Sequence, residues 1–179
     1  MINMIVAYSK NRGIGVCNKL PWHIPEDLKR FKWLTIGNGH NAVIMGRKTY
    51  ESLPTKLLSL RKNIVVSNTL CREKNPHLII KRNMFDALEY CEYTNRNEAW
   101  IIGGSQIYDT ALKEHNVNNI LVTEIDKDFT CDTFIDEFPD NFKLIYTGRW
   151  KKTEYLRYRY LHYKNQNLTL NRSPYSYGN

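Results

Sequence analysis

The stretch Ala99–Ile125, AWIIGGSQIYDTALKEHNVNNILVTEI, contains two short apolar runs separated by a glycine pair and a helical pattern. The runs at Ala99–Ile102 and Ile120–Ile125 are rich in strand-forming residues, and Ser105–Lys113 is typical of a helix. A strand, a helix and a second strand in this order imply a right-handed crossover between parallel strands. The stretch therefore predicts one unit of an α/β fold.

The same alternation extends from this unit towards both ends of the chain. Further strands are predicted at Ile2–Ser9, Asn41–Met45, Asn63–Ser67 and His77–Ile80, and further helices at Pro25–Thr35, Thr49–Leu53 and Met84–Tyr93. Several strand runs are continuously apolar, as expected of strands that are buried on both faces. We therefore expect a mostly parallel sheet with helices on both faces.

The C-terminal part follows a different pattern. Phe142–Trp150 and Thr153–Tyr163 succeed one another without a helix, which predicts an antiparallel hairpin at the edge of the sheet. Residues 1–164 are expected to form one domain, and the polar, aperiodic segment Asn165–Asn179 is expected to be a mobile tail.

Composition narrows the class of protein. The chain has 179 residues, of which 42% are hydrophobic and 25% charged, which excludes a disordered or fibrous chain. No apolar run approaches the roughly 18 residues of a membrane span. The N-terminal sequence lacks the features of a secretory signal, and the widely spaced cysteines form no C-x-x-C pair. We expect a cytoplasmic protein with reduced thiols.

The net charge of +8 predicts a surface that attracts anions. The basic residues are scattered, and no nucleic-acid-binding motif is present, so nucleic acid is not expected as the main partner. A small polyanionic ligand explains the charge equally well.

Gly13-Ile14-Gly15 follows the first predicted strand and suggests a dinucleotide-binding fingerprint. That fingerprint requires a third small residue and an immediate helix, whereas Asn18 stands at the third position and the chain continues to Pro21. We interpret the segment as a flexible loop at the end of the first strand, where open α/β sheets bind ligands.

The segment Leu20–Leu28, LPWHIPEDL, leads into a predicted helix. On that helix Asp27 lies four residues before Phe31, and Leu28 three residues before it, so a carboxylate stands beside an apolar surface. This arrangement suits a flat heterocycle whose edge donates N–H groups to the carboxylate. The alternative is that Asp27 only complements the helix dipole while Phe31 faces the core.

Two strand-to-helix turns have the composition of anion sites. Gly46-Arg47-Lys48-Thr49 combines cations with a helix start, and in Gly103-Gly104 the absence of a Cβ atom allows a phosphate to approach the backbone. Each could be an ordinary turn, but two on one sheet favour a dinucleotide. No serine or cysteine nucleophile motif occurs, and no metal is predicted because the histidines lack ligand spacing. The chemistry would then come from a cofactor.

Five segments in order resemble dihydrofolate reductase: I-x-A-x-S-x-N-x-G-I-G, L-P-W-x-x-P-x-D-L-x-x-F-K, V-I-M-G-R-K-T-x-x-S-L, I-I-G-G-S-x-I-Y and L-x-V-T-E-I. They span Ile2 to about Tyr163. The resemblance implies a central sheet of about eight strands. It also implies hydride transfer from NADPH to 7,8-dihydrofolate in support of one-carbon metabolism, and a monomeric enzyme.

The resemblance assigns roles residue by residue. Asp27 would bind the pterin and promote protonation of N5, with Leu20 in the closing loop and Trp22 organising water. The substrate would contact Ile5, Leu28, Phe31, Lys32, Leu53, Arg61 and Thr123. NADPH would contact Ala7, Ile14, Gly15, Arg47, Lys48, Thr49, Ser67, Asn68, Arg82, Gly103, Gly104, Ser105, Gln106, Ile107 and Tyr108. Family members have a cis peptide at the position of Gly103-Gly104.

Some positions depart from the family pattern. Ser59-Leu60 stands where Pro-Gly usually precedes the arginine, which puts the reach of Arg61 in question. Two other functions remain open at this point. One is a riboflavin-pathway type of pyrimidine reductase on the same scaffold, which lacks the P-W-x-x-P-x-D segment. The other is a non-catalytic folate- or nucleotide-binding protein.

Overall fold

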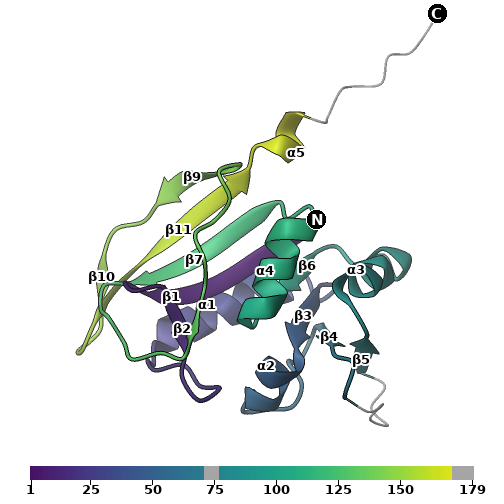
Figure 1. The fold of residues 1–179 in the computed structure, drawn as a ribbon, viewed down its shortest axis with the longest axis horizontal. Helices are drawn as coiled ribbons and strands as arrows, with labels where there is room; N and C mark the ends of the chain where they lie inside the picture. The colour runs from purple at the N-terminus through teal and green to yellow at the C-terminus, as the bar shows by residue number, and fades with distance from the viewer. Residues whose placement is uncertain (71–76, 171–179) are drawn as a thin grey trace, which may run out of the picture.

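A computed structural model describes residues 1–70 and 77–170, in which the chain folds around a single large sheet (Figure 1). The predictions for Cys71 and for the tail beyond residue 170 lie outside the described residues. Within them the strand order is β10-β11-β7-β1-β6-β3-β4-β5, with β9 also paired to β11, so the sheet has nine strands. The strands are β1 (Ile2–Ser9), β3 (Ala42–Gly46), β4 (Lys62–Val66), β5 (Leu78–Lys81), β6 (Ala99–Ile101), β7 (Asn119–Ile125), β9 (Phe142–Thr147), β10 (Lys151–Lys152) and β11 (Arg157–Asn165).

The pairing confirms the predicted topology. Strands β1, β3, β4, β5, β6 and β7 pair in parallel, whereas β11 runs antiparallel to β7, β9 and β10. Sheets with mixed direction commonly carry the antiparallel strands at one edge.

Asn165, the first residue of the predicted tail, is the last residue of β11 and is buried. Residues Asn167–Leu170 then form the short helix α5.

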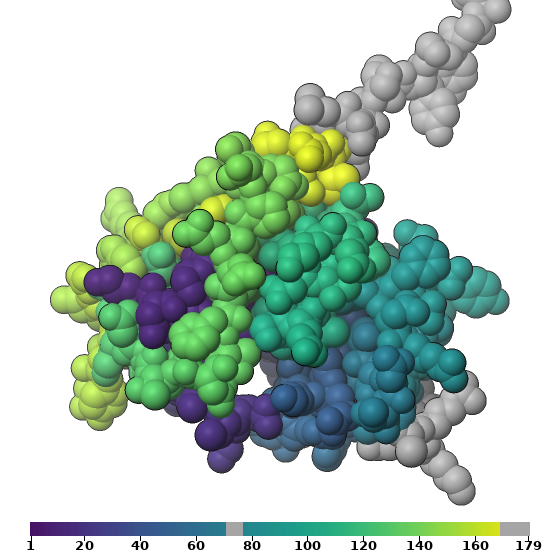
Figure 2. All heavy atoms as spheres, in the orientation of Figure 1, coloured from purple at the N-terminus to yellow at the C-terminus, as the bar shows by residue number. Residues whose placement is uncertain are grey.

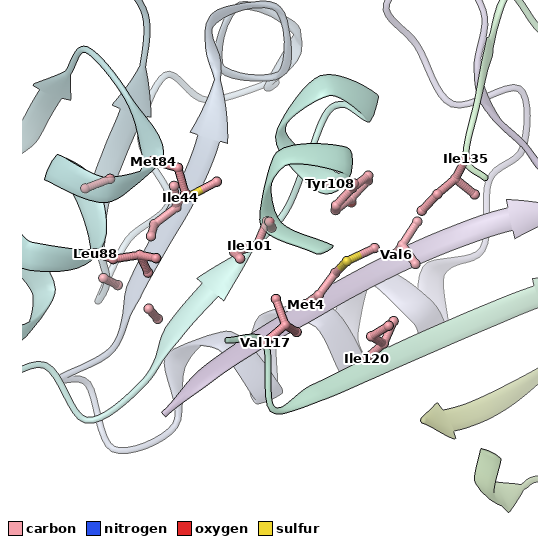
Figure 3. Packing of buried hydrophobic residues seen from close by; sticks show 14 of the residues in the cluster. Met4, Val6, Ile44, Met84, Leu88, Ile101, Tyr108, Val117, Ile120 and Ile135 are labelled. Carbon is pink, nitrogen blue, oxygen red and sulfur yellow. The ribbon is translucent and has the colours of Figure 1, made fainter. Parts of the chain in front are cut away.

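Helices cover both faces of the sheet, as predicted. They are α1 (Pro25–Ile36), α2 (Arg47–Ser52), α3 (Met84–Tyr93) and α4 (Ser105–Glu114). Alternate residues of β1 enter different cores: Met4 and Val6 pack with Tyr108 of α4, whereas Ile5 lies in the core that also takes in Phe31 of α1. Figure 3 shows the first of these cores, with Tyr108 and Ile135 directed towards β1.

Helix α1 begins and ends where its sequence favours it. Pro25 occupies the first turn, where a missing N–H costs nothing, and Glu26 and Asp27 complement the positive end of the helix dipole. The helix ends at Gly37, which has a φ of 53° and donates its N–H to the carbonyl of Trp33. The helix therefore presents Asp27 at its N-terminal end.

The prediction of a flexible loop at Gly13–Gly15 was wrong. These residues form strand β2, which pairs antiparallel with β8 (Thr133–Phe134). The segment between β7 and β9 runs beside α4, where its green atoms adjoin those of the helix in Figure 2, and Ile135 joins the core there. Arg12 fastens this segment, because its guanidinium donates to backbone carbonyls of Ile135 and Asp136.

Candidate active site

The centre of the site is a carboxylate that contacts a hydroxyl from the sheet. Asp27 of α1 accepts a hydrogen bond from Oγ1 of Thr123 on β7, with Oγ1 and Oδ1 2.6 Å apart. Thr123 is 1% exposed and pairs in register with Ala7 of β1. The interpretation of Asp27 as a mere helix-dipole partner therefore fails, because its side chain reaches across to the sheet.

Burial raises the pKa of Asp27 above its ordinary value, and the hydrogen bond from Thr123 and the positive charge of Arg30 oppose that rise. A carboxyl group with a raised pKa can take up a proton nearer neutral pH than an exposed one. Perturbed acids of this kind are typical of catalytic sites. The arrangement can thus both accept hydrogen bonds from a ligand and supply a proton.

The apolar residues predicted near this carboxylate lie mostly in one core. Ile5 is buried on β1, and Phe31 and Leu53 are half-buried in the core on the same face of the sheet. Leu28 is 47% exposed although it lies next to Asp27, so it offers apolar surface to a ligand. Lys32 lies on α1 and is exposed.

The segment before α1 contributes one exposed and one buried side chain. Leu20 is 52% exposed, whereas Trp22 is 8% exposed and packs edge-on against Phe129. The indole Nε1 of Trp22 is buried and has no hydrogen-bond partner among the described residues. Buried donors are usually satisfied by protein or ordered water, so this N–H is suited to a water or a ligand.

Arg61 lies close to α1 despite the unusual Ser59-Leu60 that precedes it. One guanidinium nitrogen donates to Oγ1 of Thr35 at 2.7 Å, and Nε donates to the carbonyl of Ser59 at 2.9 Å. Its Cζ lies 5.9 Å from the ring centroid of Phe31. Leu60 adopts a φ of 59°, the left-handed conformation that glycine favours.

The glycine turn before α4 is packed against the backbone of β3. The peptide between Gly103 and Gly104 is cis, as the resemblance implied, and the Gly46 N–H donates to the Gly103 carbonyl at 2.7 Å. A Cβ atom on Gly103 would lie 3.0 Å from the Tyr108 ring. The Tyr108 hydroxyl donates to the carbonyl of Ile5, so it links the turn to β1.

The first residues of α4 lie directly beyond this turn. Ser105 and Ile107 are half-buried and Gln106 is exposed. The N-terminal N–H groups of a helix lack acceptors within the helix, and Gly104 as N-cap makes no side-chain bond to them. An anion at this point would find free donors.

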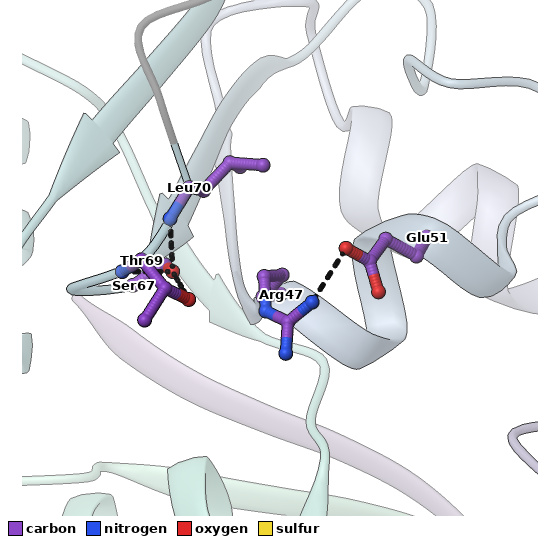
Figure 4. Close-up of polar contacts among 5 residues, drawn as sticks. All are labelled: Arg47, Glu51, Ser67, Thr69 and Leu70. Atoms are coloured by element: carbon purple, nitrogen blue, oxygen red, sulfur yellow. Dashed lines mark hydrogen bonds and ion pairs between the residues drawn. The ribbon is translucent and has the colours of Figure 1, made fainter.

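A second group of polar side chains lies beyond β3 and β4 (Figure 4). Arg47 forms an ion pair with Glu51 at 2.9 Å, and both side chains are 43% exposed. The Ser67 oxygen accepts the N–H groups of Thr69 and Leu70. It also lies 3.5 Å from Oγ1 of Thr69, so one of these two hydroxyls can donate to the other. The remaining predicted residues here are Lys48, Asn68 and Arg82, all exposed, and Thr49, which is half-buried.

No sequence motif points to Asp132, which lies beside the predicted cofactor residue Gly15. Its carboxylate accepts the Cys17 N–H at 2.7 Å, and its own N–H donates to the Gly15 carbonyl at 3.0 Å. The Cys17 N–H is the main reason that the pKa of Asp132 is lowered. Asp132 therefore holds the segment that contains Ile14 and Gly15 beside the end of β1.

Residues 1–70 and 77–170 contain neither a cluster of metal ligands nor a membrane-spanning helix. No three His, Cys, Asp or Glu side chains in these ranges lie together as metal ligands would. No helix there has the length and apolar character needed to cross a bilayer.

Comparison with known proteins agrees with this geometry. Residues 1–165 match the family described as dihydrofolate reductase. The dihydrofolate reductase of Drosophila melanogaster is 38% identical over 149 residues, which are 79% of this chain and 82% of that protein. That of Bacillus subtilis is 37% identical over 161 residues, 89% of this chain and 90% of the relative. That of Buchnera aphidicola is 39% identical over 137 residues, 76% and 80% of the two chains. The chain therefore belongs to the dihydrofolate reductase family.

Proposed function

We propose that this protein reduces 7,8-dihydrofolate to 5,6,7,8-tetrahydrofolate with NADPH, and so supplies one-carbon metabolism. The observation that carries the proposal is the contact of Asp27 with Thr123 between apolar residues of α1 and β1. The family match favours this reaction over a pyrimidine reductase or a non-catalytic binding protein.

Asp27 is the proposed proton donor and pterin anchor. Its carboxylate would accept hydrogen bonds from the amino group and a ring nitrogen of the pterin while Leu28 and Phe31 pack on the ring. NADPH, when bound, supplies the hydride that reaches C6. The proton that balances this hydride goes to N5, directly from Asp27 or through water beside Trp22. General acid catalysis of this kind contributes about 10²–10⁴-fold.

Arg61 is the proposed partner of the substrate's glutamate. A planar guanidinium matches a carboxylate better than an ammonium group does. Its contacts with Thr35 and Ser59 restrict the side chain beside Phe31, so it would meet an incoming anion with little further ordering. Burial lowers the pKa of Arg61, although such a group stays charged at neutral pH.

The residues beyond β3 and β4 fit the phosphates of NADPH. Arg47, Lys48 and Ser67, with Asn68 and Arg82, would surround the 2′-phosphate, because three of these side chains are cations and a serine hydroxyl can donate to a phosphate oxygen. At the glycine turn, Gly103 and Gly104 would bring the pyrophosphate to the N-terminal N–H groups of α4. Thr49 and the first turn of α4 would complete that site, with Ala7, Ile14 and Gly15 towards the nicotinamide.

The direct test is to measure NADPH oxidation by the purified protein through the absorbance of the reduced nicotinamide. Oxidation should require dihydrofolate, and NADH should be a poorer donor. Oxidation that proceeds equally without dihydrofolate, or none with it, would refute the proposal.

We also propose that the protein is cytoplasmic and monomeric. Cys17, Cys91 and Cys131 are free thiols, which suits a reducing compartment such as the cytoplasm. A monomer is expected, and the elution volume in size-exclusion chromatography tests it.

A further inference from the structure

Arg30 is a cation that lies one helical turn beyond Asp27 and is covered by the sheet. Its Cζ stands 4.1 Å from the ring centroid of Tyr160 on β11, the geometry of a cation–π contact. One terminal guanidinium nitrogen, Nη1, is buried and has no hydrogen-bond partner among the described residues. Burying an incompletely paired charge is unfavourable. A guanidinium in this position therefore calls for a compensating interaction.

Tyr160 is placed next to the catalytic carboxylate by strand register. It pairs directly with Thr123, the residue that hydrogen-bonds Asp27. The Tyr160 hydroxyl is also buried and without a partner among the described residues. The negative charge of Asp27 contributes to the raised pKa of Tyr160, after the effect of burial. The ring thus holds Arg30 against the sheet, within electrostatic range of Asp27.

The neighbouring acid, Glu26, is exposed, and its negative charge is paired. Glu26 pairs with Lys151 of β10, and the Tyr158 hydroxyl donates to its Oε2 at 2.6 Å. These hydrogen bonds, from Lys151 first, lower the pKa of Glu26. Lys151 also stands 5.1 Å from the Tyr160 ring centroid, on which Arg30 packs. Two adjacent acids of α1 therefore have different surroundings: one is paired at the surface, the other is inside near Arg30.

The groups that face Asp27 act in different directions. On its own helix Glu26 raises the pKa of Asp27 and Arg30 lowers it; from β7, the Thr123 hydroxyl lowers it. From β11, the Tyr160 hydroxyl is neutral at physiological pH, as any tyrosine is, and burial raises its pKa further. Arg30 forms no ion pair with Asp27 in the described part of the chain, so it acts at longer range.

We propose that Arg30, held against the ring of Tyr160, is a positioning residue that keeps a positive charge one helical turn from Asp27, where the proton is transferred. In this proposal Arg30 acts through Asp27 and not on the substrate. The charge of Arg30 would thereby set the pH range over which the rate of hydride transfer is high. This inference rests on the proposed catalytic role of Asp27.

The test removes the charge of Arg30 and, as a matched control, that of its exposed neighbour Lys29. In Arg30→Met, Asp27 should retain its proton to higher pH, and the pH profile of hydride transfer should move up by about half a unit. Lys29→Met lowers the net charge equally but should leave the profile in place. The Asp27 carboxyl carbon, followed by NMR in the free protein, reports its titration independently of activity.

Two substitutions of Tyr160 separate the charge from the packing. Tyr160→Leu removes the ring that holds Arg30 and should move the profile upwards as Arg30→Met does. Tyr160→Phe retains the ring and should leave it unchanged. Arg30→Lys, which keeps the charge, should restore most of the parent profile.

Two results would contradict parts of this account in distinguishable ways. If Arg30→Met leaves both the carboxyl titration and the rate profile of a folded protein unchanged, the role of Arg30 is wrong. If the carboxyl titration moves while the rate profile does not, the effect of Arg30 on Asp27 stands and the catalytic role of Asp27 is wrong.

Discussion

The proposed substrate side and the proposed cofactor side of the site carry their charges in opposite surroundings. Asp27 is largely enclosed and already hydrogen-bonded to Thr123 from the sheet. On the cofactor side Arg47 is exposed and paired with Glu51 from its own helix. Exposed pairs of this kind contribute little to stability, typically less than about 1 kcal/mol.

This difference suggests that the charge of Asp27 serves to position a reacting group, whereas the charge of Arg47 serves to attract an anionic ligand. An enclosed carboxylate with a fixed partner is held in one place, as proton transfer requires. An exposed guanidinium with a weak partner can exchange Glu51 for a phosphate at small cost, as reversible cofactor binding requires. Substitutions on the two sides should therefore affect different kinetic constants.

The largest effect is expected from Asp27→Asn, which keeps the shape of the side chain but removes the acid. The single-turnover rate of dihydrofolate reduction at pH 7 should fall by about 10²–10⁴-fold. Stopped-flow fluorescence of NADPH measures this rate. The affinity for NADPH should change little, and an equal loss in cofactor affinity would contradict the separation of the two sides.

The next effect concerns the choice of cofactor. Replacing both Arg47 and Lys48 by Ala should erode the preference for NADPH over NADH by roughly 100-fold, since two charge-assisted contacts are worth about 1.5 kcal/mol each. The ratio of kcat/KM for the two cofactors measures it, with the KM for dihydrofolate as the internal control. An unchanged ratio would place the 2′-phosphate elsewhere.

A smaller effect is expected from Thr123→Val, which preserves shape but removes the hydrogen bond to Asp27. The loss of this bond should raise the pKa of Asp27 further and shift the pH profile upwards. It should also lower kcat/KM for dihydrofolate roughly tenfold. A Thr123→Ser variant retains the hydroxyl and should stay near the parent, so similar losses in both variants would argue against the hydrogen bond.

The smallest effect concerns stability. Leu60 has a φ of 59° and is 68% exposed, so Leu60→Gly removes strain and few contacts. The free energy of unfolding should rise by about 0.5–1 kcal/mol, after allowance for the greater freedom of glycine in the unfolded chain. Thermal unfolding measures this, and Leu60→Ala, which keeps the Cβ atom, should show no gain.

The elements that could be predicted have strong local patterns. The apolar runs of β1, β3 and β7 and the amphipathic helix α1 are such elements, and the motif on α1 also located Asp27. Strands β2 and β8 were missed because three and two residues are too few for a period to be read. Their pairing depends on distant segments that meet only in the folded chain.

Contacts between segments far apart in the sequence could not be predicted either. Asp132 lies in an irregular stretch with no motif, and its bond to the Cys17 N–H depends on how two loops meet. The packing of Arg30 on Tyr160 depends on the register of β11 with β7. A one-residue slip would place Tyr160 on the other face of the sheet.

The measurement that tests the central claim most directly is the pH dependence of hydride transfer in the Asp27→Asn protein. If Asp27 supplies the proton, solvent must replace it in the variant. The variant's rate should then rise about tenfold for each unit by which the pH falls, approaching the parent rate in acid. A variant rate that equals the parent rate at neutral pH, or that does not respond to pH, would contradict the account.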